Sequence, residues 1–253
     1  MTAFKTILSR VLSQTPLQYW PVRVRQGIAC GARWTLLPHS ANWRLGGERD
    51  IELALRLHGG LCGAVCWDLG AHFGIHTVGL AMQVGSKGQV SGFEPDPDAF
   101  ARLKRHVRMN SLNQVKLFNA AVSEVDGAGQ MIVSGGLGST FTHMRYEDES
   151  VHLNTPVISI HTVKLDSLVN TGEISAPDFI KVDVQGHGAK ALRGAMKTLR
   201  SKRPTILFSS HGPHESEGVH ILARELAYRC FDVEGREISW LEDHSGTAVL
   251  MGQ

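Results

Sequence analysis

A chain of 253 residues is long enough for one large α/β domain, alone or with a small N-terminal addition. Its 42% hydrophobic and 20% charged residues are ordinary for a globular protein. The formal net charge of +2 gives no reason to expect nucleic acid as the main partner, and the basic runs at 104–108 and 200–203 are interpreted as solvated helix faces and ends.

Two further classes are disfavoured by the residue pattern. No stretch approaches the roughly eighteen apolar residues of a membrane span, and the first fourteen residues lack the apolar core of a signal peptide. The four cysteines form no CxxC pair, so we expect free thiols and a cytoplasmic protein. Cys62 and Cys66, followed by His72 and His76, fit no standard zinc spacing, so we expect no metal ion. The oligomeric state stays open.

The first sixty residues differ in pattern from the rest and predict a small cap or lid. Its expected elements are a helix over 4–12, a strand pair within 27–37 and a helix from Glu48 to His58. We therefore divide the chain into an N-terminal helical/β cap at 1–60 and a main domain at 61–253.

From residue 64 onward, short apolar runs alternate with helical segments. Strands are expected at 64–70, 89–95, 115–123, 178–184, 204–210, 231–240 and 247–251. Helices are expected at 74–84, 97–110, 187–199 and 219–228. The looser stretch 130–161, with GGLGST at 135–140, predicts a hairpin and a mobile loop. Alternating strands and helices predict a mostly parallel α/β sheet, and the last two strands a terminal antiparallel hairpin, which is the layout of a Rossmann-like class I methyltransferase sheet.

A glycine turn follows the first strand of this sheet. Gly70 allows a sharp turn out of the strand, and Gly74 allows the next helix to start close against the sheet. Asp68 can orient the turn or meet the ammonium end of a cofactor. Glu94 ends the second strand, where a carboxylate can accept hydrogen bonds from both hydroxyls of a ribose. The pattern predicts an adenosine-binding half-site.

A nicotinamide or flavin dehydrogenase could use the same half-site. The pyrophosphate fingerprint GxGxxG needs a middle glycine so that the backbone can touch phosphate. Here His72 stands in the turn, and the carboxylate of Asp68 disfavours a diphosphate but suits an ammonium. We therefore expect S-adenosylmethionine as the cofactor and keep a nucleotide-cofactor oxidoreductase as the less favoured alternative.

The residues now in view resemble the FkbM family of methyltransferases from about Gly46 to the C-terminus. The resemblance is carried by WDLGAHFGIHT, GFEPDPDAFARLKRHVRMN, NAAVS, VKLDSL at 163–168 and, most distinctively, DFIKVDVQGHGAKALRGAMKTL. The family implies methyl transfer, typically to an oxygen of a sugar or secondary metabolite. It also implies a cofactor site lined by Asp68, Gly70, His72, Gly74, Glu94, Pro95 and Asp96, with Ala121 and Val122 flanking the adenine.

The chain departs from this family where acids are expected. The family usually carries glutamate at the position of Gln185, an acid at Gly188 and glutamate at Ser209, although His211 is retained. The acidic cluster around Asp183 is therefore thinned. A second hypothesis follows, in which the chain binds the cofactor but acts as a weakly active or inactive partner protein.

Candidate catalytic residues follow from the reaction. Methyl transfer to an alcohol needs an aligned nucleophile and a base. Asp183 lies at a strand's carboxyl end facing the same crevice as Gly70, so it is the first candidate for the base or a positioning group. His187 and His211 come next, because a neutral imidazole can accept a proton near pH 7. We expect an O-methyltransferase acting on a small-molecule or glycan acceptor.

Overall fold

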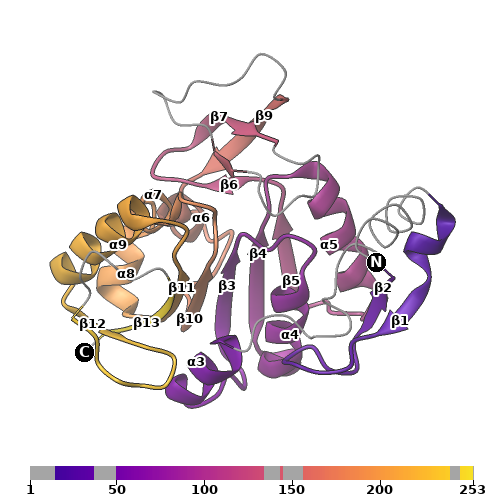
Figure 1. Ribbon diagram of the computed structural model, residues 1–253, viewed down its shortest axis with the longest axis horizontal. Coiled ribbons are helices and arrows are strands. Elements are labelled where there is room, and N and C mark those ends of the chain that lie inside the picture. Colours follow the sequence, from indigo (N-terminus) through magenta and orange to yellow (C-terminus); the bar gives the residue numbers. More distant parts are fainter. Residues whose placement is uncertain (1–14, 37–49, 134–142, 145–155, 240–245, 253) are drawn as a thin grey trace, which may run out of the picture.

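The strands of the main sheet lie side by side across the middle of the computed structural model (Figure 1). The model describes residues 15–36, 50–133, 143–144, 156–239 and 246–252. Within these residues, seven strands form one sheet in the order β12-β13-β11-β10-β3-β4-β5. Their bounds are β3 Val65–Leu69, β4 Gln89–Phe93, β5 Val115–Phe118, β10 Phe179–Val182, β11 Thr205–Ser209, β12 Tyr228–Phe231 and β13 Thr247–Gly252.

The strand directions confirm the predicted fold class. Strands β11, β10, β3, β4 and β5 run parallel, while β13 is antiparallel to both of its neighbours, β11 and β12. The order reverses between β3 and β10, since β4 and β5 continue to one side and β10 and β11 to the other. A reversal point of this kind places ligands beyond the carboxyl ends of the adjacent strands.

Helices cover both faces of the sheet. They are α3 Asp50–His58, α4 Ile75–Val84, α5 Pro97–Met109, α6 Leu165–Asn170, α7 Gly188–Arg193, α8 Met196–Lys202 and α9 Pro213–Glu225, with 3₁₀ turns at Pro16–Tyr19 and Gly85–Lys87. Successive strand residues point to opposite faces. In β10, Phe179 therefore packs with α3 and α4, whereas Ile180 and Val182 pack with α7, α8 and α9. This alternation decides which polar side chains of the strands can meet.

A second sheet lies over the carboxyl ends of the main strands (Figure 1). Its order is β6-β9-β7-β8, with bounds β6 Ala121–Val122, β7 Gly127–Ile132, β8 His143–Met144 and β9 Val157–Val163. The predicted single strand at 115–123 is therefore wrong. The main-sheet strand ends at Phe118, and the Asn119 amide then donates to the carbonyl oxygens of Glu94 and Pro95. The chain turns there, and Ala121–Val122 pairs with β9 instead.

The expected hairpin in 130–161 exists as the antiparallel pair of β7 and β9, although it begins earlier, at Gly127. The GGLGST segment lies outside the described residues.

The N-terminal part contributes a strand pair that packs on the main domain. Strand β1 (Pro21–Arg23) pairs with β2 (Arg33–Thr35), so the strand pair begins earlier than predicted, and most of 24–32 forms the connection. Trp34 is fully buried and stacks on the His106 ring of α5 at 3.5 Å. The expected helix at 4–12 lies outside the described residues, and the domain boundary at residue 60 stays a prediction.

Two helix predictions need correction. The single helix expected at 187–199 is two helices, α7 and α8, and Gly194 lies between them. A Cβ at Gly194 would collide with the carbonyl oxygen of Ser123, so a side chain would not fit there. The helix expected at 219–228 begins at Pro213 and ends at Glu225. Tyr228 consequently starts β12, and no strand spans the described part of 232–240. In the described part of the chain, none of the helices is long and apolar enough to cross a membrane.

Candidate active site

Asp68 and Lys181 face each other on the central strands. They are register partners on β3 and β10, and both side chains point to the face covered by α4. The Lys181 ammonium lies 3.4 Å from the Asp68 carboxylate, and both side chains are at most 3% exposed. Thr77 of α4 donates its hydroxyl hydrogen to Asp68 at 2.5 Å. This geometry fits the predicted role of Asp68 in orienting the turn, and its predicted contact with the cofactor stays a prediction.

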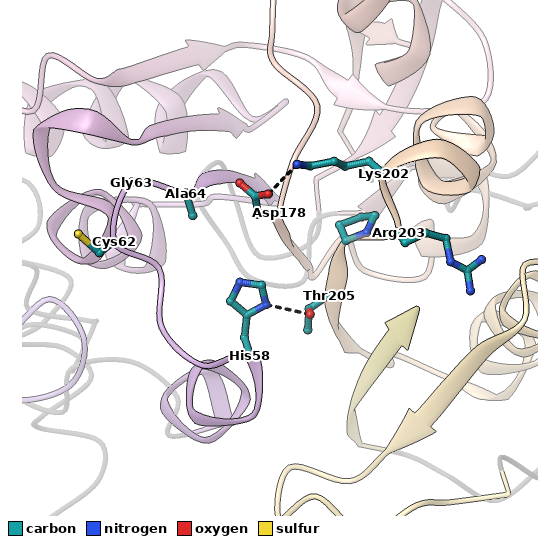
Figure 2. A pocket seen from close by; sticks show the side chains of 9 residues that line it. His58, Cys62, Gly63, Ala64, Asp178, Lys202, Arg203 and Thr205 are labelled. Atoms are coloured by element: carbon teal, nitrogen blue, oxygen red, sulfur yellow. Dashed lines mark hydrogen bonds and ion pairs between the residues drawn. The ribbon is translucent and has the colours of Figure 1, made fainter. Parts of the chain in front are cut away.

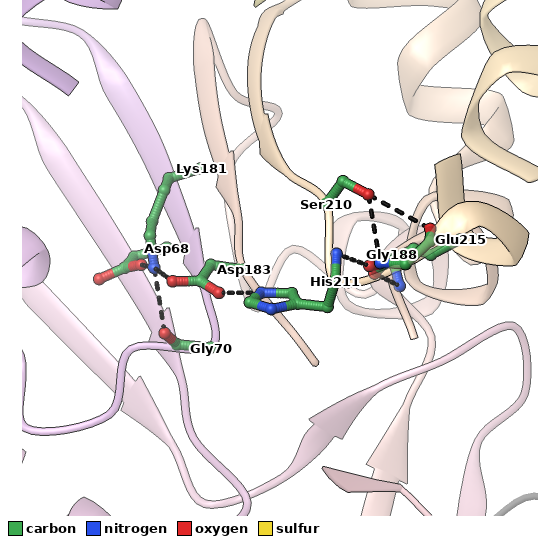
Figure 3. A network of polar contacts seen from close by, with 9 residues as sticks. Asp68, Gly70, Lys181, Asp183, Gly188, Ser210, His211 and Glu215 are labelled. Atoms are coloured by element: carbon green, nitrogen blue, oxygen red, sulfur yellow. Dashed lines mark hydrogen bonds and ion pairs between the residues drawn. The ribbon is translucent and has the colours of Figure 1, made fainter. Parts of the chain in front are cut away.

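Lys181 connects three groups at the strand ends (Figure 3). Besides Asp68, its ammonium lies 3.3 Å from the Asp183 carboxylate and donates to the Gly70 carbonyl oxygen at 3.2 Å. The sequence analysis missed this residue. A signal was present, since Lys181 is a lone charge inside an otherwise apolar strand and shares a face with Asp183.

Gly70 turns the chain out of β3 with φ of +80°, as the sequence predicts. A Cβ at this position would collide with the carbonyl group of Asp183. The glycine is therefore required by the approach of two main-chain segments within the protein. Gly74 has a similar cause, since a Cβ there would collide with Leu103 of α5, so its close packing is against a helix and not against the sheet.

We expect Gly70→Ala to lower the free energy of unfolding for two reasons, the left-handed conformation of alanine and the collision of its Cβ. The collision should add about 1–3 kcal/mol to the cost of the left-handed conformation. Gly172 provides the matched control, because its φ is +72° and its missing Cβ would meet nothing within 4 Å. Gly172→Ala should cost about 1 kcal/mol. Urea unfolding of both variants measures the difference, and equal costs would contradict the collision with Asp183.

Glu94 links the turns that follow β3 and β4. One carboxylate oxygen accepts the amide hydrogen of His72 at 2.7 Å, and the other that of Asp96 at 2.8 Å. Burial raises the pKa of Glu94 to about 7 despite these two amide donors, which lower it. A carboxylate has about four acceptor positions, so each oxygen keeps one for a further donor. That donor chemistry suits the two hydroxyls of a ribose.

The other predicted cofactor residues lie around this carboxylate. Asp96 caps α5, since its side chain accepts the amide hydrogens of Asp98 and Ala99 at 2.8 and 3.0 Å. His72 adopts a left-handed conformation with φ of +49°, and its ring stacks on Phe73. The half-buried Pro95 lies between the two acids. The arrangement gives Asp96 a helix-capping role and leaves Glu94 as the main carboxylate of the half-site.

Ala121, Val122 and His187 lie deeper than a surface-lining role suggests. Ala121 and Val122 are buried in the second sheet, at 5% and 3% exposure. His187 is also 5% exposed, and its Nε2 lies 3.1 Å from the hydroxyl of Ser123. Burial lowers the pKa of His187 to about 4. The structure brings these three residues together at the base of the second sheet, and their functional roles stay predictions.

Asp183 and His211 form a hydrogen-bonded pair at the carboxyl ends of β10 and β11 (Figure 3). The Asp183 carboxylate lies 2.6 Å from Nε2 of His211, and both side chains are partly exposed. Burial alone would raise the pKa of Asp183, but the Lys181 ammonium and the His211 contact hold it well below its usual range. The hydrogen bond to Asp183 in turn raises the pKa of His211. Two of the three predicted catalytic residues are thus brought together.

A separate pocket lies at the opposite end of the sheet (Figure 2). It is lined by residues that precede or begin β3, β10 and β11, among them Ala64, Asp178 and Thr205. In this pocket, Lys202 forms an ion pair with Asp178 at 2.8 Å, and the His58 ring forms a hydrogen bond with the Thr205 hydroxyl at 2.9 Å. Because this pocket lies at the amino ends of the strands, it is distinct from the region around Asp183, which follows the carboxyl end of β10. No cluster of three metal-binding side chains occurs in the residues that the structure describes.

A family model, the methyltransferase FkbM domain, matches residues 68–230, from Asp68 at the end of β3 to Cys230 of β12. The chain belongs to the FkbM methyltransferase family. The predicted resemblance is confirmed, and support for the oxidoreductase alternative falls away. The matched residues 68–230 include the glycine turn, Glu94 and the Asp183–His211 pair.

Two curated relatives are similar to this chain in sequence. The chain is 30% identical over 176 residues to the hexuronic acid methyltransferase AglP of Haloferax volcanii, covering 67% of this chain and 66% of AglP. It is also 30% identical over 134 residues to the 2-O-methyltransferase NoeI of Sinorhizobium fredii, covering 48% of this chain and 54% of NoeI. The match thus spans slightly under two thirds and about half of these relatives' own lengths.

Among solved structures, an FkbM methyltransferase from Methylobacillus flagellatus is similar with a TM-score of 0.49 and 19% identity. That match covers 74% of this chain and 43% of the other.

Proposed function

We propose that this FkbM domain is an S-adenosylmethionine-dependent O-methyltransferase that methylates a sugar hydroxyl. The observation that carries the proposal is that Glu94 and the Asp183–His211 pair both lie at the carboxyl ends of the parallel strands, near the reversal point of the sheet. The names of the two relatives support a sugar acceptor, since one is a hexuronic acid methyltransferase and the other a 2-O-methyltransferase.

The residues present fit the proposed cofactor. Glu94 would hold the ribose hydroxyls with the acceptor positions that its two amide contacts leave. The turn at Gly70 and His72 would border the amino-acid end, with the paired Asp68 behind it. When bound, S-adenosylmethionine supplies an electrophilic methyl group on a positively charged sulfur.

His211 would act as the base for the acceptor hydroxyl. Asp183 holds the imidazole through Nε2, which leaves Nδ1 as the ring nitrogen available to accept a proton. Nδ1 of His211 would take the proton of the acceptor hydroxyl as the hydroxyl oxygen takes up the methyl group. The negative Asp183 stabilises the imidazolium that results, which is the arrangement expected for a base held by a carboxylate.

The absence of acids at Gln185, Gly188 and Ser209 favours a second candidate function, in which the protein binds the cofactor but transfers methyl groups weakly. Calorimetric titration with S-adenosylmethionine tests what the two candidates share, and no binding would contradict both. Release of S-adenosylhomocysteine across a panel of sugars, including hexuronic acids and 2-hydroxyl-blocked analogues, separates them. Turnover with one sugar class supports the first candidate, and binding without turnover across the panel supports the second.

Cofactor binding should depend on the protonation of Glu94. Because the pKa of the free Glu94 is about 7, the carboxylate form dominates only above that pH. Ribose hydroxyls donate to the charged form and lower its pKa, so binding releases a proton. The affinity should therefore weaken by up to about tenfold for each pH unit below 7.

Calorimetry at pH 6.5 in two buffers of different ionisation enthalpy measures this proton release directly. The amino group of the cofactor itself titrates near pH 8, at about the usual α-amino value. The proton release measured with Glu94→Gln gives the contribution of this amino group, which is subtracted from the wild-type value. A Glu94→Gln variant that keeps the wild-type proton release would contradict the assignment.

A further inference from the structure

Glu215 lies behind the Asp183–His211 pair on the first turn of α9. We propose that Glu215 is a positioning residue that holds His211 against Asp183 and supplies the negative charge that the thinned acidic cluster lacks. The inference rests on the proposed function for its catalytic meaning, while its structural content is independent of the methyl acceptor.

The Glu215 carboxylate accepts hydrogen bonds from the main chain of His211 and of Gly188 (Figure 3). One oxygen accepts the amide hydrogen of His211 at 2.8 Å, and the other accepts the amide hydrogen of Gly188 at 2.7 Å. It thereby connects three segments, namely the end of β11, the start of α7 and the start of α9. His211 lies two residues beyond the end of β11, so this contact fixes the main chain from which its imidazole projects.

Gly188 makes room for this carboxylate. A Cβ at position 188 would lie 2.7 Å from the Glu215 oxygen and 2.8 Å from the ring of Phe208, both too close. This is one of the positions where the family resemblance leads one to expect an acid. The carboxylate of Glu215, arriving from α9, occupies the space next to this main chain, so the loss of an acid at 188 and the presence of Glu215 are sterically linked.

The Glu215 carboxyl group is buried, which disfavours its charged form. The residue is 5% exposed, and burial raises the pKa of its carboxyl. Two amide hydrogens and the neighbouring His211 imidazole, when protonated, oppose this effect and lower the pKa of Glu215. A buried carboxylate is often less favourable for stability than an apolar side chain of similar size. Its position beside His211 is therefore consistent with a role in setting the charge and orientation of that residue.

Three charged groups act on the His211 imidazole. Asp183 at the end of β10 and Glu215 on α9 raise the pKa of His211, whereas the Lys181 ammonium on β10 lowers it. Glu215 thus makes His211 a stronger base and keeps its main chain in register with Asp183. Losing the carboxylate should weaken both effects.

Histidine NMR titration of the full chain tests the inference without any acceptor. His211→Gln assigns the His211 signal among the thirteen histidines. In Glu215→Gln, we expect the titration midpoint of His211 to fall by about half a pH unit. The matched control is Glu217→Gln, an exposed glutamate on the same helix, which should leave the midpoint unchanged. A folded Glu215→Gln protein with the wild-type His211 midpoint would overturn the proposal.

Gly188→Ala provides a second, independent perturbation. It keeps the Glu215 charge but displaces it from its amide contacts, so the His211 midpoint should again shift downward. This variant decides the question if Glu215→Gln does not fold, and an unchanged midpoint would then count against the proposal. Once an acceptor is known, Glu215→Gln should also lower kcat about tenfold at constant cofactor affinity. Wild-type protein that binds no S-adenosylmethionine would instead contradict the proposed function and leave the titration result valid.

Discussion

Replacing Asp183 with asparagine is expected to lower kcat for methyl transfer by about 10²–10⁴-fold, the usual contribution of general base catalysis. The amide would still contact His211 but would not stabilise the imidazolium or favour Nδ1 as the proton acceptor. Glu94 and its two amide contacts are remote from the substitution in the chain and are unchanged by it, so affinity for S-adenosylmethionine should stay within about twofold.

The pH profile gives this prediction a second readout. The protonated His211 cannot accept a proton, so activity falls as the pH drops through the pKa of His211, which Asp183 raises. In Asp183→Asn, the pKa is lower, and the acidic limb of the residual activity should move to lower pH. Asp178→Asn is the control, since Asp178 precedes the same strand but lies at its opposite end beside Lys202. Asp183→Asn with kcat within threefold of wild type would contradict the role.

Lys181→Met is expected to destabilise the protein by about 3–5 kcal/mol, because it leaves a buried carboxylate without its cation. Asp68 is fully buried, and the Lys181 ammonium is its charge partner at 3.4 Å. The methionine side chain fills a similar volume, so the loss reports the charge and not a cavity. Urea unfolding monitored by circular dichroism measures the change in the free energy of unfolding.

Two further variants interpret the result. Lys116→Met breaks the exposed pair with Glu173 at 3.2 Å and should cost at most about 1 kcal/mol. Adding Asp68→Asn to Lys181→Met removes the uncompensated charge and should restore part of the lost stability. If Lys181→Met is no more destabilising than Lys116→Met, the buried pair does not have the importance assigned to it.

Much of the main sheet follows from local sequence alone. Short apolar runs such as 65–69 and 205–209 give buried strands, and the amphipathic segment 97–109 gives a helix whose start is marked by Asp96 and Pro97. The predictions failed where contacts distant in sequence decide the structure. Phe118 ends its strand because Asn119 binds the chain beyond β4, and the helix expected at 187–199 breaks where Gly194 meets the second sheet.

The residues predicted for the cofactor could be placed from the sequence, because each lies in a short segment at the end of a predicted strand. Asp68, Gly70 and Glu94 lie at the ends of adjacent strands, and the turn geometry of glycine is a local property. The sequence by itself thus determined the fold class, the family and the position of this turn.

Only the tertiary structure decided what the polar groups do. It placed Asp68 beside Lys181 in the protein interior, and it paired Asp183 with His211 while burying His187. It also brought Glu215 from α9 to the space beside Gly188. These outcomes depend on strand register and on helix packing between segments far apart in the chain. Such contacts set the burial and charge of each group, and no local pattern in the sequence contains them.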